Sequence, residues 1–411
     1  MKKVLSILIL LILIWLPLNI NIRTATGTNL KGLDKALKFI VWPSQHQQQL
    51  DFYFHSITLG NRFNGGMLIA QDGKIIYRKV HGFTDFKTKD SLDIHAQFQL
   101  ASVSKQFTSV AILKLKDEGK LNLDDSVARY LPGFPYPGIT IRHLLSHQSG
   151  LTDYHHITPT DTFFYLTNDS LLSAINNKQL VEAYARPGKR FDYCNTNYAL
   201  LASIVEKISK QKFPEYMQQQ IFEPLGMANT FVYVPGVVTN SQKKMTLGHN
   251  PNNTHLDPVS ADGVYGDKNI YSTLNDLFLW NEALNNNLIV SEQSISDAWT
   301  PQNNRSRTLR NYGLGWRLNM ANNHKMVYHS GWWRGYNTIL VNIPEHKMTI
   351  VILANKRTRS FFSNYYSIIN TLLPGYFPTH EAPEEGILQS PEMEMAPHEL
   401  NMTDSLFSIL Q

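Results

Sequence analysis

Strand-like segments occur near both ends of this chain, and a long helical middle separates them. Two β-rich runs, residues 67–70 and 74–80, flank a turn that contains Asp72 and Gly73, which predicts an antiparallel hairpin. Strand patterns return only after residue 300, at 312–318, 326–329, 337–342 and 348–354. Because a strand must pair with another strand, we expect one sheet built from both ends of the chain, with a helical lobe inserted between them.

Helical periodicity dominates residues 102–300, most clearly at 197–208 and 273–284, and a last helix is predicted near 361–373. An early helix is predicted over 33–54, where Trp42-Pro43 must bend or break it. With 411 residues, of which 43% are hydrophobic and 17% charged, the composition is that of a globular protein. We therefore expect an α/β fold of the α+β type with two lobes, a sheet lobe and a helical lobe.

The first residues have the pattern of an export signal. Lys2 and Lys3 precede a largely apolar run, residues 4–18, and small residues follow at 24–27. An apolar helix of that length spans roughly 22 Å, which is less than the ~30 Å hydrocarbon core of a bilayer. We expect residues 1–26 to be a signal peptide and the protein to be periplasmic or extracellular. The alternative is a retained anchor that holds the protein at the membrane, facing the periplasm.

Charge is distributed unevenly along the sequence. The net charge is +5, yet the segment after His380 holds seven acidic residues and no lysine or arginine. We expect this acidic tail, residues 378–411, to be disordered and the remainder to be basic. A basic body favours anionic surfaces such as wall polymers, but a solvated charged face is the preferred interpretation. Basic stretches interleaved with aromatic residues are absent from the sequence, which argues against nucleic-acid binding.

The stretch "SVSK" places Ser102 at a predicted helix start and Lys105 in its first turn, followed by a mostly apolar run. Residues i and i+3 share one helix face, so the two side chains lie within reach of each other. Burial and the positive end of the helix dipole both lower the pKa of a lysine amine, and a neutral amine accepts a proton from a hydroxyl. The backbone N–H of Ser102 would also serve as an oxyanion donor. The alternative is a capping serine beside a lysine that reaches solvent.

Two further motifs follow in order. "YCN" places Tyr193 and Asn195 just before a helix, and "HSG" places His329 and Gly331 at the end of a strand. With these motifs, the chain resembles the serine β-lactamase and DD-peptidase clan, in particular its branch of class C β-lactamases, DD-carboxypeptidases, D-aminopeptidases and esterases. The stretches "LNLDDSVARYLPGF", "ITIRHLLSHQSGL" and "YGLGWRL" extend the resemblance over residues 60–375. It implies the β-lactamase/transpeptidase-like fold.

The resemblance also implies roles for these residues. Ser102 is the expected nucleophile and Lys105 the group that activates it. Tyr193 is the expected second acid/base, which passes a proton to the leaving group, and Asn195 orients Lys105 and the substrate carbonyl. His329 occupies the strand position that is lysine in many relatives. The implied chemistry is acyl transfer through a covalent acyl-enzyme that water releases.

The residues after the strand motif are expected to bind substrate. The resemblance implies that Gly331 lies against the substrate and that Trp332 supplies the second oxyanion N–H from its backbone. Trp332 and Trp333 could form an aromatic wall over the cleft or belong to the core. Relatives commonly carry a small hydroxylated residue at position 332, which helps to hold a carboxylate. Arg334 is therefore a candidate replacement for carboxylate recognition.

Two other residue patterns would suggest different chemistry. Cys194 lies between two proposed site residues and would suggest a thiol nucleophile, but a small buried filler is the simpler interpretation. As the chain has one cysteine, no internal disulfide is possible. His143 and His147 have the spacing of a zinc pair, but the glutamate of H-E-x-x-H is missing, so structural histidines are expected. We expect neither a metal nor another cofactor.

The sequence thus predicts an exported serine hydrolase acting on a D-amino-acid-containing peptide or related small amide, for example one derived from peptidoglycan, with weak β-lactam hydrolysis. One rival is a carboxylesterase with the same machinery, and another is a non-catalytic binder or sensor of wall fragments. We expect a monomer that binds no nucleic acid. The expected hydrolase domain is residues 27–377, with a sheet lobe of about 30–101 and 301–377 and a helical lobe of about 102–300.

Overall fold

The computed structural model describes residues 38–156, 164–177, 185–303, 310–321, 324–358, 361 and 364–376. The predicted signal, 1–26, and the predicted acidic tail, 378–411, lie outside the described residues. The elements below all belong to the unit that begins at Val41. Within the described residues, no helix combines the length and the apolar character needed to cross a membrane.

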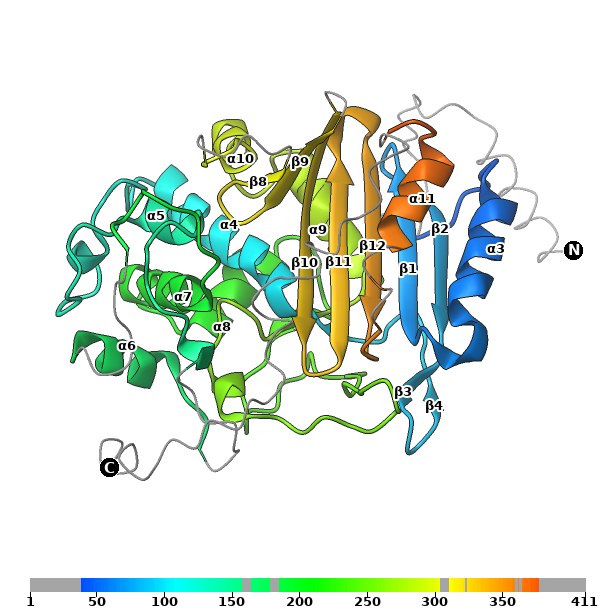
Figure 1. The fold of residues 1–411 in the computed structure, drawn as a ribbon, viewed down its shortest axis with the longest axis horizontal. Helices are drawn as coiled ribbons and strands as arrows, with labels where there is room; N and C mark the ends of the chain where they lie inside the picture. The colour runs from blue at the N-terminus through cyan, green and yellow to red at the C-terminus, as the bar shows by residue number, and fades with distance from the viewer. Residues whose placement is uncertain are drawn as a thin grey trace, which may run out of the picture. The chain divides into compact units, whose positions relative to one another are not determined.

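A seven-stranded antiparallel sheet forms the centre of the fold, with the strand order β2-β1-β12-β11-β10-β9-β8. Strands β1 and β12 pair from Gly65 opposite Ala354 to Gln71 opposite Met348, so the two ends of the chain meet inside one sheet (Figure 1). This confirms the central prediction from the strand pattern. The strands are β1 (Gly65–Gln71), β2 (Lys74–His81), β8 (Arg310–Tyr312), β9 (Arg317–Ala321), β10 (His324–Trp333), β11 (Tyr336–Ile343) and β12 (Met348–Ala354).

One predicted strand is wrong. The pattern at 312–318 suggested a single strand, but the chain turns there between β8 and β9. Gly315 has a φ of +104° in this turn, and a Cβ at Gly315 would lie 2.1 Å from Ser109 Oγ. The turn therefore needs glycine both for its left-handed backbone and for its close approach to α4 (Ser104–Asp117). A period-two pattern alone does not reveal that interruption.

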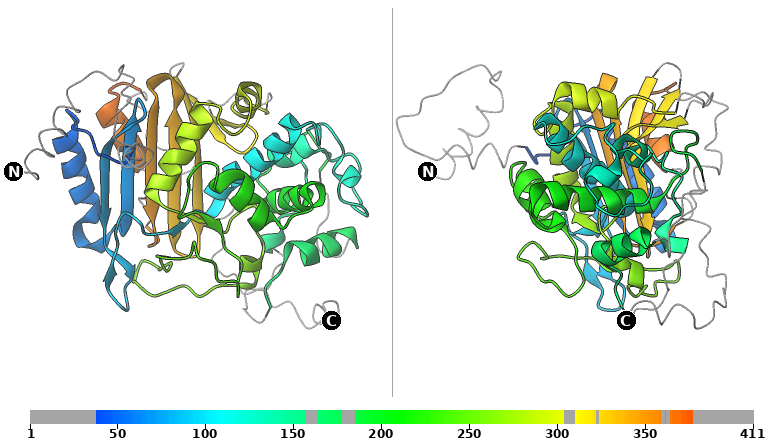
Figure 2. Two further views of the ribbon diagram at one scale, coloured as in Figure 1. Left: turned by 180° about the vertical axis from the view of Figure 1, so that it is seen from behind. Right: turned by 90° about the vertical axis from the view of Figure 1, so that its left-hand side faces the viewer.

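Helices cover both faces of the sheet. On one face, α3 (Gln47–Thr58) and α11 (Asn364–Leu372) pack over a core that includes Leu50, Tyr328 and Ile369 (Figure 1). On the other face lies α9 (Leu274–Asn285), seen across the sheet in the rear view (Figure 2). Asn281 on α9 donates a hydrogen bond of 2.7 Å to Thr349 Oγ1 on β12. Helix α9 therefore packs on the sheet, although its sequence lies within the range expected for the helical lobe.

The early helix is shorter than predicted, because α3 begins at Gln47, after Trp42-Pro43. A proline disfavours helical geometry in the residue before it, so the two sides of this pair do not form one helix. Residues 33–37 of the predicted helix lie outside the described part of the chain.

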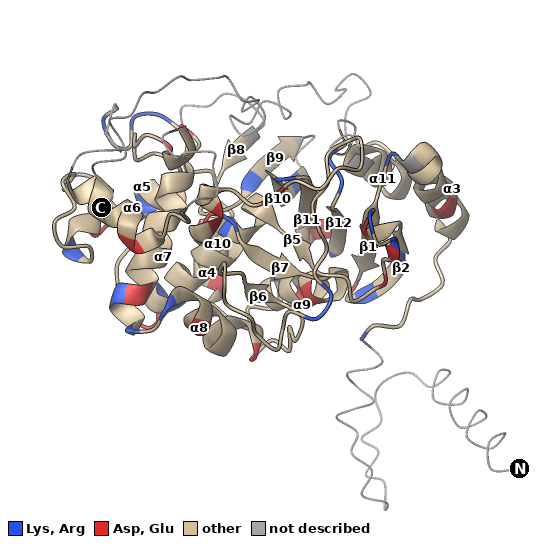
Figure 3. Cartoon of the chain, turned by 90° about the horizontal axis from the view of Figure 1, so that it is seen from below, with Lys and Arg blue, Asp and Glu red and all other residues tan. Residues whose placement is uncertain are grey.

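The middle of the chain is mainly helical, as predicted. Its helices are α4, α5 (Ile141–Leu145), α6 (Asn168–Asn176), α7 (Asn195–Ser209), α8 (Phe213–Met217) and α10 (Glu292–Ala298). Two-residue and three-residue strands that no pattern predicted also occur in this region, as β5 (Phe98–Gln99), β6 (Phe231–Val232) and β7 (Ile270–Ser272). Both signs of charge are interspersed along the described elements (Figure 3). This distribution fits a solvated charged surface.

Candidate active site

The chain enters α4 through a short 3₁₀ turn, Ala101–Val103, which contains Ser102. Ser102 therefore precedes the helix and is not its cap, because Val103 holds the cap position and no side chain caps this end. Ala101, just before the serine, has a φ of +48°. Residues other than glycine rarely adopt this left-handed conformation, and such strain gathers at functional sites.

Lys105 is the centre of the site. Its side chain is fully buried, at 0% exposure. Lys105 Nζ lies 2.9 Å from Ser102 Oγ, 2.6 Å from Asn195 Oδ1 and 3.1 Å from the backbone carbonyl oxygen of Asp267. Burial disfavours an ammonium ion, and so does the positive end of the helix dipole in the first turn of α4. The structure thus brings the predicted serine, lysine and asparagine together in hydrogen-bonding contact.

Tyr193 lies on the other side of the lysine amine. Lys105 Nζ is 4.9 Å from the centre of the Tyr193 ring, and the tyrosine is 7% exposed. The ring of His147 packs against Tyr193 with centroids 4.2 Å apart. The guanidinium of Arg317 on β9 lies 5.1 Å from the same ring centre. Tyr193 therefore packs near the Lys105 amine, the Arg317 guanidinium and the His147 ring.

Strand β10 contributes alternate residues to the site. Successive side chains of a strand point to opposite faces, and Tyr328 belongs to the core beneath α3 and α11. His329, Gly331 and Trp333 therefore face α4 and the site, whereas Trp332 faces away from it. Trp332 indeed packs against that same core, with the guanidinium of Arg357 4.9 Å from its ring centre.

His329 is fully buried, and its partners indicate its protonation. Its Nδ1 lies 2.7 Å from the carbonyl oxygen of Ser330, and its Nε2 lies 3.0 Å from the hydroxyl of Tyr312. A proton on Nδ1 satisfies both contacts, since Nδ1–H then donates to Ser330 and Nε2 accepts from Tyr312. Burial lowers the pKa of His329 well below its usual value, and the charges of Arg317 and Lys105 lower it further. The position that is lysine in many relatives is therefore held by a neutral side chain.

The last two predicted residues, Trp333 and Arg334, both contact the middle region of the chain. Trp333 stacks on His155 with centroids 4.9 Å apart and donates from Nε1 to Asp262 Oδ1 at 2.5 Å, which ties β10 to the helical region. Arg334 lies in the turn after β10 with a φ of +41°, and its guanidinium donates to the backbone carbonyl of Asp257. Of the two tryptophans, Trp333 alone can act as an aromatic wall of the site.

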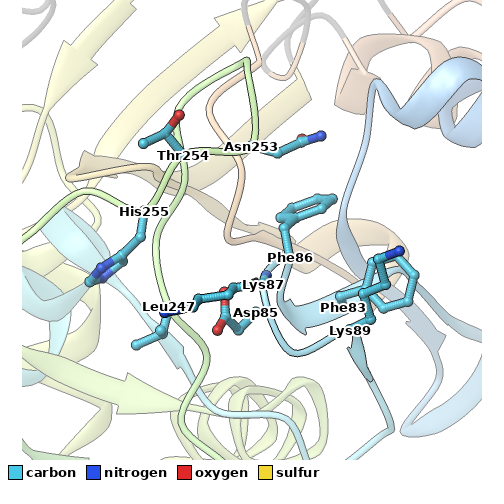
Figure 4. A pocket seen from close by; sticks show the side chains of 9 residues that line it. All are labelled: Phe83, Asp85, Phe86, Lys87, Lys89, Leu247, Asn253, Thr254 and His255. Atoms are coloured by element: carbon cyan, nitrogen blue, oxygen red, sulfur yellow. Dashed lines mark hydrogen bonds between the residues drawn. The ribbon is translucent and has the colours of Figure 1, made fainter.

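One cavity lies away from these residues. A hollow of about 760 Å³ opens between the hairpin β3 (Phe83–Asp85) and β4 (Asp90–Ser91) and the loop at 247–255 (Figure 4). Phe86, Lys87 and His255 are among the residues that line it, and no predicted site residue does so. Ser102, by contrast, is only 4% exposed. This hollow is therefore separate from the predicted active site.

Comparison with known proteins decides the family. A family model described as Beta-lactamase matches residues 59–373. The chain belongs to the beta-lactamase family. Within this family it is similar to penicillin-binding protein 4* of Bacillus subtilis (strain 168), with 34% identity over 325 residues, or 75% of this chain and 72% of that protein. It is also similar to protein Flp of Staphylococcus aureus (strain N315), with 29% identity over 326 residues, or 75% of this chain and 63% of that protein.

Solved structures agree with this family assignment. The octameric penicillin-binding protein homologue from Pyrococcus abyssi matches with a TM-score of 0.69 and 26% identity, over 83% of this chain and 80% of that chain. The predicted β-lactamase/transpeptidase-like fold is thus confirmed. The protein is a beta-lactamase-family serine hydrolase and a homologue of penicillin-binding proteins.

Contacts of the other candidate residues explain why they are structural in this family member. Burial raises the pKa of the Cys194 thiol, so a thiolate nucleophile is disfavoured. His143 Nδ1 accepts the N–H of Thr140, and His147 Nδ1 accepts the N–H of Cys194 at 3.0 Å. Over the described ranges, the histidine and carboxylate atoms close enough to share a metal ion belong to His324, Glu345 and His346, at the opposite end of β10.

Arg317 and Asp153 are among the residues that contact the site and that sequence reasoning missed. Arg317 lies inside the quoted stretch "YGLGWRL", and Asp153 follows "ITIRHLLSHQSGL" by two residues. Asp153 accepts hydrogen bonds from Asn195, as described below. No local spacing connects either residue to the site, because both contacts are made across the fold.

Gly331 should not tolerate a side chain. A Cβ at this position would lie 2.3 Å from the carbonyl oxygen of Leu100 and 2.9 Å from the backbone nitrogen of Ser102. Because backbone atoms cannot move aside cheaply, Gly331→Ala is expected to lower the free energy of unfolding by about 1–3 kcal/mol and to displace Ser102. Urea denaturation and labelling of the serine with a fluorophosphonate measure the two effects. Gly138→Ala is the matched control, since its Cβ would meet nothing within 4 Å, and equal behaviour of the two variants would contradict the steric explanation.

Arg317 is expected to support Tyr193 electrostatically. A cation over an aromatic ring contributes about 0.5–2 kcal/mol, and more once the phenol loses its proton. Arg317→Met keeps the length of the stem but removes the charge, so it should slow fluorophosphonate labelling of Ser102 about 10-fold. An unchanged labelling rate would show that the guanidinium contributes packing only.

Proposed function

We propose that this chain is an exported serine hydrolase that acts through an acyl-enzyme on a D-amino-acid-containing peptide or a related small amide. The observation that carries the proposal is the fully buried Lys105 Nζ, 2.9 Å from Ser102 Oγ. A buried amine in contact with a hydroxyl is the arrangement that activates a serine nucleophile. Structural packing alone would place an apolar side chain there.

The proposed reaction proceeds in two halves. Ser102 Oγ attacks the substrate carbonyl carbon, and its proton passes to Lys105 Nζ. The negative charge that develops on the carbonyl oxygen faces the backbone N–H groups of Ser102 and Trp332. Tyr193 delivers a proton to the leaving nitrogen, which departs with the second half of the substrate. Water then hydrolyses the ester on Ser102 and regenerates the hydroxyl.

Asn195 and His329 complete the proposed machinery. Asn195 Oδ1 accepts a hydrogen bond from Lys105 Nζ at 2.6 Å, so orienting the lysine amine is its role in the proposed reaction. A neutral His329 contributes shape and hydrogen bonding instead of charge. The relatives named as penicillin-binding proteins support acylation of the serine by β-lactams, and we propose that β-lactam hydrolysis is weak in this chain.

A carboxylesterase with the same machinery is the second candidate, and one observation favours it. The residue after Gly331 is Trp332, whose side chain packs on the opposite face of the sheet. No hydroxyl is therefore supplied at that position to hold a substrate carboxylate. Arg334 does not replace it in the proposal, since its guanidinium engages Asp257. A non-catalytic binder of wall fragments is disfavoured, because binding needs no serine, lysine and tyrosine in mutual contact.

Location and partners follow as part of the same proposal. The N-terminal pattern supports export, with a membrane-held form as the alternative, and an exported hydrolase of this kind meets peptides derived from peptidoglycan. We propose a monomer that needs no cofactor and binds no nucleic acid.

A substrate panel tests the proposal. The purified protein is incubated with a D-alanyl-D-alanine peptide, a D-amino-acid amide, p-nitrophenyl acetate and a chromogenic cephalosporin, with Ser102→Ala as the control. Turnover of the D-amino-acid substrates by wild type alone supports the proposal. Turnover of the ester without the D-amino-acid substrates supports the esterase. If none of these substrates is turned over and Ser102 forms no adduct, only the non-catalytic binder of wall fragments remains.

A further inference from the structure

The orientation of the Asn195 side-chain amide decides whether it can hold Lys105. One end of this group, Oδ1, accepts hydrogen bonds, and the other end, Nδ2, only donates them. In the structure Oδ1 faces Lys105 Nζ. An amide turned by 180° has almost the same shape, yet it would present N–H groups to the lysine instead. Something beyond Lys105 must therefore select one orientation.

Asp153 contacts Asn195 from the side opposite to Lys105. Asp153 Oδ2 accepts the backbone N–H of Asn195 at 2.6 Å and its side-chain Nδ2–H at 2.9 Å. The other carboxyl oxygen, Oδ1, accepts the backbone N–H of His155 at 3.0 Å. The Asp153 side chain is only 11% exposed, so water competes little for these bonds. Both oxygens of the carboxyl group therefore accept hydrogen bonds.

His155 provides a second acceptor for the same amide. Its Nδ1 lies 3.0 Å from Asn195 Nδ2, so an unprotonated Nδ1 accepts the second hydrogen of that NH₂ group. Burial and the charges of Lys268 and Lys105 lower the pKa of His155 well below its usual value, which keeps the ring neutral. Two acceptors on one side of the amide leave only Oδ1 for the lysine.

We propose that Asp153 is a positioning residue for the hydrolase reaction: it fixes the start of α7 and the amide of Asn195, and through them the amine of Lys105. This inference rests on the proposed function, because it assumes that Lys105 activates Ser102. Asp153 touches neither the serine nor the substrate in this scheme. Its effect on the reaction passes through Asn195.

A double-mutant cycle tests this directly. The variants are Asp153→Ala, Asn195→Ala and the double variant, and the readout is the second-order rate constant for labelling of Ser102 by a fluorophosphonate. A small misplacement of a catalytic group costs up to about 100-fold, so each single variant should lose about 10- to 100-fold. If Asp153 acts through Asn195, the double variant should be within about 3-fold of Asn195→Ala. The proposal would be overturned if the rate loss of the double variant equalled the product of the two single losses. It would also be overturned if Asp153→Ala lost no rate.

Two further variants separate positioning from general stability. Asp153→Asn preserves the size of the side chain. If the oxygen of the new amide accepts the hydrogen bonds from Asn195, its NH₂ group must face the backbone N–H of His155, and two donors then oppose each other. The labelling rate constant of Asp153→Asn should therefore also fall at least 10-fold. Asp276→Ala is the matched control, because Asp276 is buried and accepts the N–H of Asn229 and the hydroxyl of Thr230 away from the site. It should lower the thermal midpoint without slowing labelling. If Asp276→Ala slowed labelling as much as Asp153→Ala does, the loss in Asp153→Ala would be an effect of stability alone.

Labelling with a fluorophosphonate also tests the role of Asp153 separately from the proposed substrate. A fluorophosphonate reports an activated serine whatever the natural substrate is. If wild type is labelled but turns over no D-amino-acid substrate, the substrate assignment fails while the cycle still decides the role of Asp153. If wild type is not labelled at all, Ser102 is not activated and both proposals are overturned.

Discussion

Lys105→Met is expected to slow acylation of Ser102 by about 10²- to 10⁴-fold, the usual contribution of a general base. The methionine side chain fills most of the volume of the lysine but cannot accept the serine proton. The protein should remain folded, since an apolar chain in this buried place avoids the cost of desolvating an amine. We expect the thermal midpoint to stay the same or rise, as is common when a strained active-site group is removed. Labelling rates and thermal unfolding of the same preparation measure both effects.

A matched lysine shows whether the effect belongs to the site. Lys356 is also buried, at 6% exposure, and its amine lies 5.3 Å from the ring centre of Phe86. Lys356→Met should therefore leave the labelling rate within about 2-fold of wild type. If Lys105→Met retained more than a tenth of the wild-type rate, the lysine would not be the base.

Stability should fall steeply when the pH drops below about 6.5, the pKa of an unfolded histidine. Burial lowers the pKa of His147, His155 and His329 well below that value in the folded protein. The unfolded chain therefore binds up to three more protons than the folded chain below this pH, which favours unfolding. Each proton contributes about 1.4 kcal/mol per pH unit, so the three together give about 4 kcal/mol per unit. Urea denaturation between pH 8 and 5 measures this slope.

Other groups set the limits of that pH range. Burial raises the pKa of Asp153 and Asp262, so these carboxyl groups bind protons more readily in the folded state and oppose the trend at lower pH. The steepest change is therefore expected between about pH 6.5 and 5. His329→Gln should reduce the slope by about 1.4 kcal/mol per pH unit, because one of the three histidines is removed. A free energy of unfolding that varies by less than 1 kcal/mol over this range would contradict the prediction.

The part of the site that sequence predicted is the part that depends on local geometry. Ser102 and Lys105 are three residues apart on one helical segment, so their contact follows from helix geometry. Their contact with Asn195 spans 90 residues and was supplied by the family resemblance alone. The contacts of Asp153 with Asn195 and of Arg317 with Tyr193 follow neither from helix geometry nor from the family resemblance. The first contact forms within the helical region, and the second forms where strand β9 meets that region.

The strand that carries His329 shows what a fuller use of periodicity would have given. Once Gly331 is taken to face Ser102, the period of two places Trp333 on the site face and Trp332 on the other. The aromatic wall could thus have been assigned to one tryptophan from sequence. By contrast, β5 and β6 are two residues long, which is too short for any alternation to be recognised.

The central claim is that Ser102 is an activated nucleophile. Intact-mass analysis after incubation with a fluorophosphonate tests it most directly, with wild type and Ser102→Ala treated in parallel. We expect one stoichiometric adduct on wild type, mapped by peptide digestion to Ser102, and none on Ser102→Ala. An adduct that persists on Ser102→Ala, or a folded wild-type protein that takes up no reagent, would contradict it.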